Sequence, residues 1–134
     1  MIEKYLIDTD VLIDYLRGNI QAVKFLKELI NGSRCFLSSI TIAELYAGVR
    51  EGEERYILDQ FIQEFQMIPL NADIAMKGGI YRRDYGKSHG LGLADALIAA
   101  SAEDYMLHLV TLNKKHYPML KEIKVPYLKI SPGL

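Results

Sequence analysis

The stretch "KYLIDTDVLIDYLRG", residues 4–18, decides the fold. In it an apolar run is followed by two aspartates and then by apolar residues at helical spacing. The apolar run Tyr5-Leu6-Ile7 carries aromatic and β-branched residues, which are typical of a buried strand, and predicts a strand over 4–8. The apolar residues that follow are spaced as on one side of a helix and predict a helix over 10–17. The stretch therefore predicts a strand that passes directly into a helix.

The junction Asp8-Thr9-Asp10 admits two interpretations. In the first, Thr9 or Asp10 is an ordinary N-cap and Gly18 ends the helix. In the second, Asp8 is a functional acid at the end of the strand. The second interpretation requires partners from elsewhere in the chain.

The rest of the chain continues to alternate between strands and helices. Further strands are predicted at 35–38, 66–70 and 107–112, a last extended piece at 125–130, helices at 20–31, 41–50, 53–65, 72–86 and 92–104, and a helical turn in "KKHYPML". This alternation predicts a parallel central sheet flanked by helices on both faces, a three-layer α/β fold in a single domain over 1–134. Ligands of such sheets bind outside the carboxyl ends of the strands.

The composition is that of an ordinary globular domain, with 50% hydrophobic and 25% charged residues. A net charge of -1 provides no overall attraction for nucleic acid, so a polyanion would need a local basic patch or a bound metal. The single cysteine, Cys35, excludes an internal disulfide, fits a reducing cytoplasm and is expected in the core. Neither a leader segment nor a stretch long enough to span a membrane is recognised, so we expect a cytoplasmic protein.

Three carboxylates follow predicted strands at strand-to-helix corners. They are Asp8, Glu44 in "SSITIAELYAGV", and Asp95 in "GLGLADALIAASA". Each also has a structural alternative: Glu44 forms a capping box with Thr41 in the first turn of its helix, and Asp95 caps a helix or faces its dipole.

The coincidence of the three acids favours a functional interpretation. In one crevice, each pair of like charges ~4 Å apart costs roughly 4 kcal/mol at an effective dielectric constant of about 20. A divalent cation removes this repulsion, and carboxylates with water suit Mg²⁺ or Mn²⁺. Such a metal activates water and stabilises charge at a phosphodiester.

A fourth corner, "LVTLNKKHY", contains Thr111 and Asn113. Asn113 either orients a water or coordinates weakly through its carbonyl, or it caps a helix.

Together these four segments resemble the PIN-domain family, and in particular the VapC-type ribonuclease toxins of toxin–antitoxin pairs. The family's metal-binding and catalytic acids match Asp8, Glu44 and Asp95. Asp10 matches a supporting polar position, and Thr111 matches the hydroxyl of the last motif. Asn113 stands at a catalytic position where many members have a fourth acid, which puts a second metal in doubt.

The resemblance implies the activity and the partners. It implies an endoribonuclease that depends on Mg²⁺ or Mn²⁺, forms homodimers, and is inhibited by a small VapB-like antitoxin bound over the active site. Five basic residues are candidates for phosphate contacts with RNA, although a solvated helix face explains each of them as well. They are Arg82, Arg83, Lys87, Lys114 and Lys115.

Two other functions compete with this one. "LIDTDV" also resembles the opening of haloacid-dehalogenase-type phosphatases, but that mechanism needs a downstream Gly-Asp motif, which the chain lacks, and assigns no role to Glu44. The second competitor is a PIN-fold binding module that has lost its activity, with Asn113 as the mark of that loss. Metal-dependent cleavage of RNA separates the enzyme from the binding module.

Overall fold

The computed structural model describes residues 3–32 and 34–128. Its five strands form one sheet in the order β3-β2-β1-β4-β5, and all neighbouring strands are parallel. The strands are β1 (Lys4–Ile7), β2 (Arg34–Ser38), β3 (Gln66–Ile68), β4 (His108–Val110) and β5 (Ile123–Lys124). The helices are α1 (Thr9–Leu16), α2 (Ile20–Gly32), α3 (Ser39–Ala47), α4 (Glu53–Phe61), α5 (Ala72–His89) and α6 (Leu93–Asp104), with 3₁₀ turns η1 (Ile62–Glu64) and η2 (Lys114–His116).

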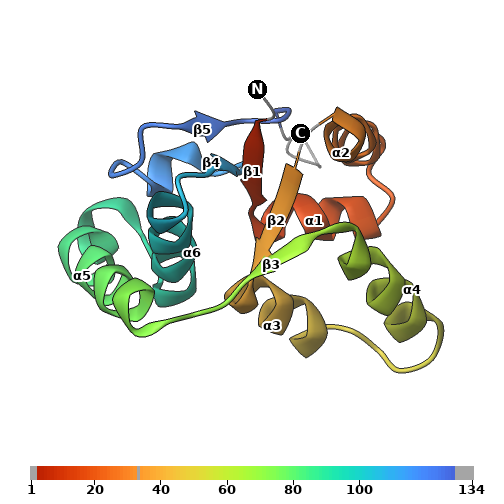
Figure 1. The fold of residues 1–134 in the computed structure, drawn as a ribbon, viewed down its shortest axis with the longest axis horizontal. Coiled ribbons are helices and arrows are strands. Elements are labelled where there is room, and N and C mark those ends of the chain that lie inside the picture. The colour runs from red at the N-terminus through yellow and green to blue at the C-terminus, as the bar shows by residue number, and fades with distance from the viewer. Residues whose placement is uncertain (1–2, 33, 129–134) are drawn as a thin grey trace, which may run out of the picture.

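Helices cover both faces of the sheet, which confirms the predicted three-layer fold (Figure 1). Side chains alternate along β1: Tyr5 and Ile7 join the apolar cluster under α1, α2 and α4, whereas Leu6 joins the cluster under α5 and α6. Cys35 is buried in the first cluster, and burial raises the pKa of its thiol to about 11. It is therefore a core residue, as expected.

The order of the strands reverses at β1. The chain proceeds from β1 to β2 and β3 on one side, whereas β4 and β5 lie on the other side. The carboxyl ends of β1 and β4 lie together, because Ile7 pairs with Val110 and the Asp8 N–H donates to the Val110 carbonyl at 2.9 Å. Such a reversal is where open α/β sheets bind their ligands.

The predicted caps of two helices are wrong. Asp8, and not Thr9 or Asp10, is the N-cap of α1, while Gly18 lies at φ +81° just past its end, as predicted. Helix α3 begins at Ser39 rather than 41, because the Ser38 hydroxyl caps it by accepting from the Thr41 N–H at 3.0 Å. Local pattern did not distinguish between neighbouring residues that are all good caps.

Other boundaries differ from the prediction as well. The strands predicted at 66–70 and 107–112 are the shorter Gln66–Ile68 and His108–Val110, and α3 ends at Ala47 rather than 50. The helix expected over 53–65 is α4 followed by η1, and α5 continues to His89 instead of ending at 86. The last strand was expected at 125–130 but is Ile123–Lys124, which pairs with Leu109 and Val110. Residues 125–128 form no strand, and 129–130 lie outside the described residues.

Over residues 3–32 and 34–128, no helix combines the length and the apolar character needed to cross a membrane.

Candidate active site

Asp8 is buried and held by three donors. Its Oδ1 accepts from the Thr9 N–H at 2.8 Å. Its Oδ2 accepts from the Thr111 hydroxyl at 2.7 Å and from the Tyr117 hydroxyl at 3.0 Å. Only 4% of Asp8 is exposed, so these bonds and the end of β1 set the direction of the carboxylate.

Asp10 ties the first turn of α1 to the segment after β4. Its Oδ1 accepts from the Val11 N–H at 2.7 Å. Its Oδ2 accepts from the Leu112 N–H at 3.1 Å and from Asn113 Nδ2 at 3.0 Å. Asn113 stands at the N-cap of η2 but makes no capping bond with its side chain. Its amide therefore positions Asp10, and the capping alternative for Asn113 is wrong.

Glu44 points out from the second turn of α3, and not from the first turn as predicted. Its Oε1 accepts from the Thr9 hydroxyl at 2.8 Å. The Thr9 oxygen lies 3.0 Å from the Thr41 hydroxyl, which lies 3.2 Å from the Ser38 hydroxyl. The capping box between Thr41 and Glu44 is absent, because Ser38 is the cap. A chain of three hydroxyls instead leads to Glu44.

Asp95 lies half-buried in the first turn of α6. The N-cap of this helix is Gly92, so the N-cap alternative for Asp95 is wrong. Its position in the first turn is favourable for a negative charge, because the N–H groups there are unpaired. The charge of Asp95 raises the pKa of Asp8, and the charge of Glu44 raises the pKa of Asp95, so Asp95 lies within electrostatic range of both acids.

Burial and the charges of neighbouring acids raise the pKa of Asp8, Asp10 and Asp95. Burial raises the pKa of Asp8 most, and the charge of Asp95 adds to it. Burial also raises the pKa of Asp95, with a further contribution from Glu44. The pKa of Asp10 rises to about 7, because the carboxyl is buried and Asp8 is close. The fold thus brings the predicted acids into one electrostatic cluster.

This acidic cluster (Asp8, Asp10, Glu44 and Asp95) has the chemistry of a site for a hard cation. All of its donors are carboxylate oxygens, and a divalent cation would offset their repulsion, with water completing its coordination. In the described part of the chain, however, no group of three or more His, Cys, Asp or Glu side chains is placed to hold a metal ion as it stands. The donor set fits Mg²⁺ or Mn²⁺, and binding would require the carboxylates to move closer together.

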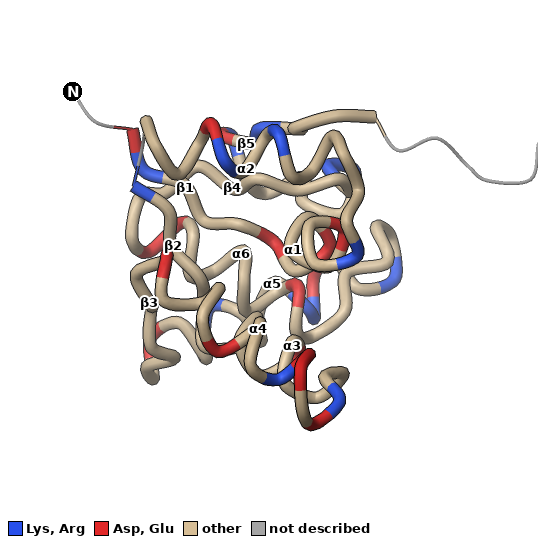
Figure 2. Tube along the Cα trace, turned by 90° about the vertical axis from the view of Figure 1, so that its right-hand side faces the viewer, with Lys and Arg blue, Asp and Glu red and all other residues tan. Residues whose placement is uncertain are grey.

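The candidate RNA contacts divide into two groups. Arg82, Arg83 and Lys87 lie on α5, which carries none of the four acids, and Arg83 pairs with Asp84 at 2.8 Å. Lys114 and Lys115 belong to η2, directly after Asn113. Figure 2 shows Lys and Arg scattered over the molecule rather than gathered on one face. The η2 lysines therefore directly follow the residue whose amide contacts Asp10 of the acidic cluster.

Sequence reasoning missed two site residues, Thr9 and Tyr117. Thr9 was considered only as a cap, and Tyr117 was not distinguished from the other 8 of the 9 tyrosines. His116 lies near enough to Asp95 to lower the pKa of that carboxyl. A hydroxyl beside a strand end was the only local signal for Thr9, and nothing local marked Tyr117.

Comparison with known proteins gives a consistent result. The sequence matches the PIN domain over residues 5–121. It is 40% identical to Ribonuclease VapC19 of Mycobacterium tuberculosis over 124 residues, which cover 91% of this chain and 98% of the relative. It is 37% identical to Ribonuclease VapC10 of the same organism over 123 residues, covering 91% and 92%. The fold is similar to a toxin-antitoxin complex from Klebsiella pneumoniae, with a TM-score of 0.79, 28% identity, and coverage of 93% and 99%.

Proposed function

The chain belongs to the PIN domain family, and from this premise we propose that it is a metal-dependent endoribonuclease, the toxin of a type II toxin–antitoxin pair. The acidic cluster at the reversal of the sheet carries the proposal. Neighbouring charges raise the pKa of Asp8, Asp10 and Asp95, so keeping these carboxylates together costs free energy that a bound cation would offset. The names of the VapC relatives support RNA as the substrate.

Asp8, Glu44 and Asp95 would hold Mg²⁺ or Mn²⁺, with Asp8 and Asp95 as the direct ligands and Glu44 acting through water. When bound, the metal lowers the pKa of a coordinated water and offsets the charge that develops on the phosphate. The chain's own residues prepare the site. Thr111 directs Asp8, and Thr9 directs Glu44, each through one hydrogen bond.

The approach of RNA would depend on the cation and on local lysines. Because the net charge of the protein is -1, no general attraction draws a polyanion toward it. Lys114 and Lys115 are exposed beside the acidic cluster and would contact the phosphates on either side of the cleaved bond. Arg82, Arg83 and Lys87 would contact RNA only if it extends onto α5.

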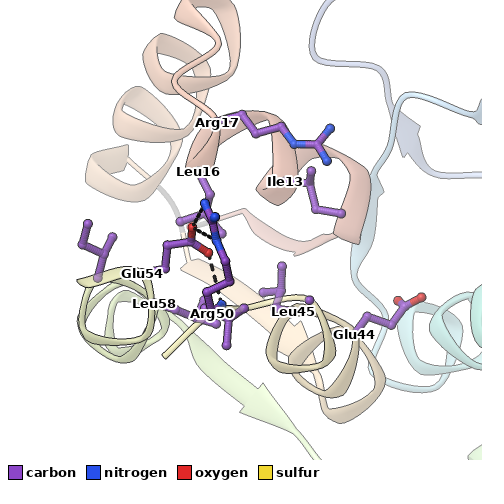
Figure 3. A pocket seen from close by; sticks show the side chains of 11 residues that line it. Ile13, Leu16, Arg17, Glu44, Leu45, Arg50, Glu54 and Leu58 are labelled. Carbon is purple, nitrogen blue, oxygen red and sulfur yellow. Dashed lines mark hydrogen bonds and ion pairs between the residues drawn. The ribbon is translucent and has the colours of Figure 1, made fainter. Parts of the chain in front are cut away.

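The inhibitor would be a small VapB-like antitoxin that enters a groove between α1, α3 and α4. This groove has a volume of about 500 Å³, and its lining includes the exposed apolar residues Leu16 and Ile57. Figure 3 shows Glu44 at one end of it, away from the ion pair between Arg50 and Glu54. An apolar segment in the groove would reach Glu44 and cover the acidic cluster. The similarity of the fold to the toxin-antitoxin complex from Klebsiella pneumoniae supports this choice of partner.

We also propose that the protein forms a homodimer in the cytoplasm, as the resemblance to VapC-type toxins implies. The reduced, buried Cys35 suits that compartment. A phosphatase of the haloacid-dehalogenase type is not proposed, because the chain matches the PIN domain. That mechanism would also leave Glu44, which accepts a hydrogen bond from Thr9 in the acidic cluster, without a role.

The test is digestion of total cellular RNA by the purified protein, freed of any partner, with the ends of the products mapped. We expect cleavage with Mg²⁺ or Mn²⁺, loss of cleavage in EDTA, and loss in Asp8→Asn. Addition of the co-purified antitoxin should suppress RNA cleavage by the wild-type protein. Equal cleavage by Asp8→Asn, or full cleavage in EDTA, would contradict the proposal. Antitoxin binding without any cleavage would identify the binding module instead.

A further inference from the structure

The two carboxylate oxygens of Asp8 are used unequally. Each oxygen of an ionised carboxylate offers about two lone-pair positions. The hydroxyls of Thr111 and Tyr117 both donate to Oδ2, and a single N–H, that of Thr9, donates to Oδ1. Oδ2 is therefore saturated, while Oδ1 keeps one position for a further ligand.

Tyr117 reaches this carboxylate from the apolar core on the α5 and α6 side of the sheet. It follows η2 and is 1% exposed, and its ring belongs to the apolar cluster under α5 and α6 together with Leu6 and Leu109. A phenol buried among apolar side chains must find a partner for its hydroxyl. It finds Asp8, donating to Oδ2 at 3.0 Å.

The Tyr117 hydroxyl connects the end of β1 to the segment after η2, since Asp8 and Tyr117 are 109 residues apart in the sequence. The rigid ring of Tyr117 has only two rotatable side-chain bonds and is enclosed by the core. It therefore holds its hydroxyl at a defined place beside Asp8 Oδ2.

We propose that Tyr117 is a positioning residue for the cation: with Thr111 it occupies Asp8 Oδ2, fixes the direction of the Asp8 carboxylate, and leaves Asp8 Oδ1 to bind the metal. This inference rests on the proposed metal-dependent function and adds to it a residue outside the acidic cluster. Groups that orient metal ligands in this way typically change metal affinity 10- to 100-fold when they are removed.

The experiment is titration calorimetry of Mn²⁺ into the full-length protein and Tyr117→Phe, which keeps the ring and removes the hydroxyl. We expect Tyr117→Phe to bind Mn²⁺ about 10-fold more weakly. Its cleavage of RNA should fall at limiting Mn²⁺ and recover as Mn²⁺ is raised, a response that a loss of packing alone would not produce.

Tyr127→Phe is the matched control. The Tyr127 hydroxyl donates to Oδ2 of another buried carboxylate, Asp14, at 2.8 Å, and Asp14 is not part of the acidic cluster. Tyr127→Phe should leave the Mn²⁺ affinity unchanged even where it lowers the melting temperature. Equal weakening of Mn²⁺ binding in both variants would overturn the proposal.

Thr111→Val provides a second measurement, since it removes the other hydroxyl that donates to Asp8 Oδ2. If Tyr117→Phe does not fold, the Mn²⁺ affinity of Thr111→Val tests the inference in its place. A folded variant of either kind that binds Mn²⁺ within twofold of the wild type would overturn the inference. Failure of the proposed function would look different, because the wild-type protein itself would neither bind Mn²⁺ nor cleave RNA.

Discussion

Gly78 sets how closely α5 packs against α6, the helix that carries Asp95, and Gly78→Ala should disturb this contact. A Cβ at Gly78 would lie 2.6 Å from Leu97 Cδ2 and 3.1 Å from Leu97 Cα. The tip of the leucine can rotate away, but its Cα can move only with the backbone of α6. Leu97 is two residues from Asp95, so a shift large enough to fit the methyl group also displaces the acid.

Gly79→Ala isolates the size of the effect. Gly79 is the next residue of α5, and nothing lies within 4 Å of its added Cβ. Both substitutions gain about 1 kcal/mol of helix propensity, so the difference between them is the cost of overpacking, about 1–3 kcal/mol. Gly79→Ala should be more stable than the wild type, and Gly78→Ala less stable or at most equal to it.

Urea unfolding of the metal-free variants, followed by circular dichroism, measures this difference. The midpoints can be compared directly when the variants have the same m-value. Cleavage of a labelled RNA at limiting Mn²⁺ should fall in Gly78→Ala and stay unchanged in Gly79→Ala. If the two variants unfold at the same urea concentration, α5 and α6 are not in the close contact described, and the reasoning is refuted.

Three further predictions concern the acidic cluster. Asp95→Asn should abolish most RNA cleavage yet raise the melting temperature of the metal-free protein, because it removes a charge that repels Asp8 and Glu44; a lower melting temperature would argue against the repulsion. Glu44→Gln should also abolish most cleavage but change the unfolding free energy by no more than about 0.5 kcal/mol, because Glu44 is exposed and the amide oxygen of Gln can still accept from the Thr9 hydroxyl; urea unfolding of the same preparation checks it. Since the pKa of Asp10 is raised to about 7 in the folded chain, the folded state binds a proton that the unfolded state releases near its ordinary pKa. Stability in EDTA should therefore fall as the pH rises from 5 to 8, and Mn²⁺ should reverse the trend; thermal melts across this range that stay flat in EDTA would count against it.

The sequence by itself determined the architecture and the edge of the sheet at which the site lies. Apolar runs with period 2 and apolar stripes with helical spacing are local properties, so their alternation predicted the three layers correctly. In a parallel sheet all carboxyl ends lie at one edge, so acids placed after strands, such as Asp8, had to meet other acids there.

Only the tertiary structure decided how each side chain is held. The bond from Thr9 to Glu44 spans 35 residues, that from Asn113 to Asp10 spans 103, and that from Tyr117 to Asp8 spans 109. No window of sequence contains both partners of such a bond. A polar residue at a helix start therefore looks the same locally whether it caps the helix or orients a distant acid, and the packing of the sheet against its two helical layers determines which of these it does.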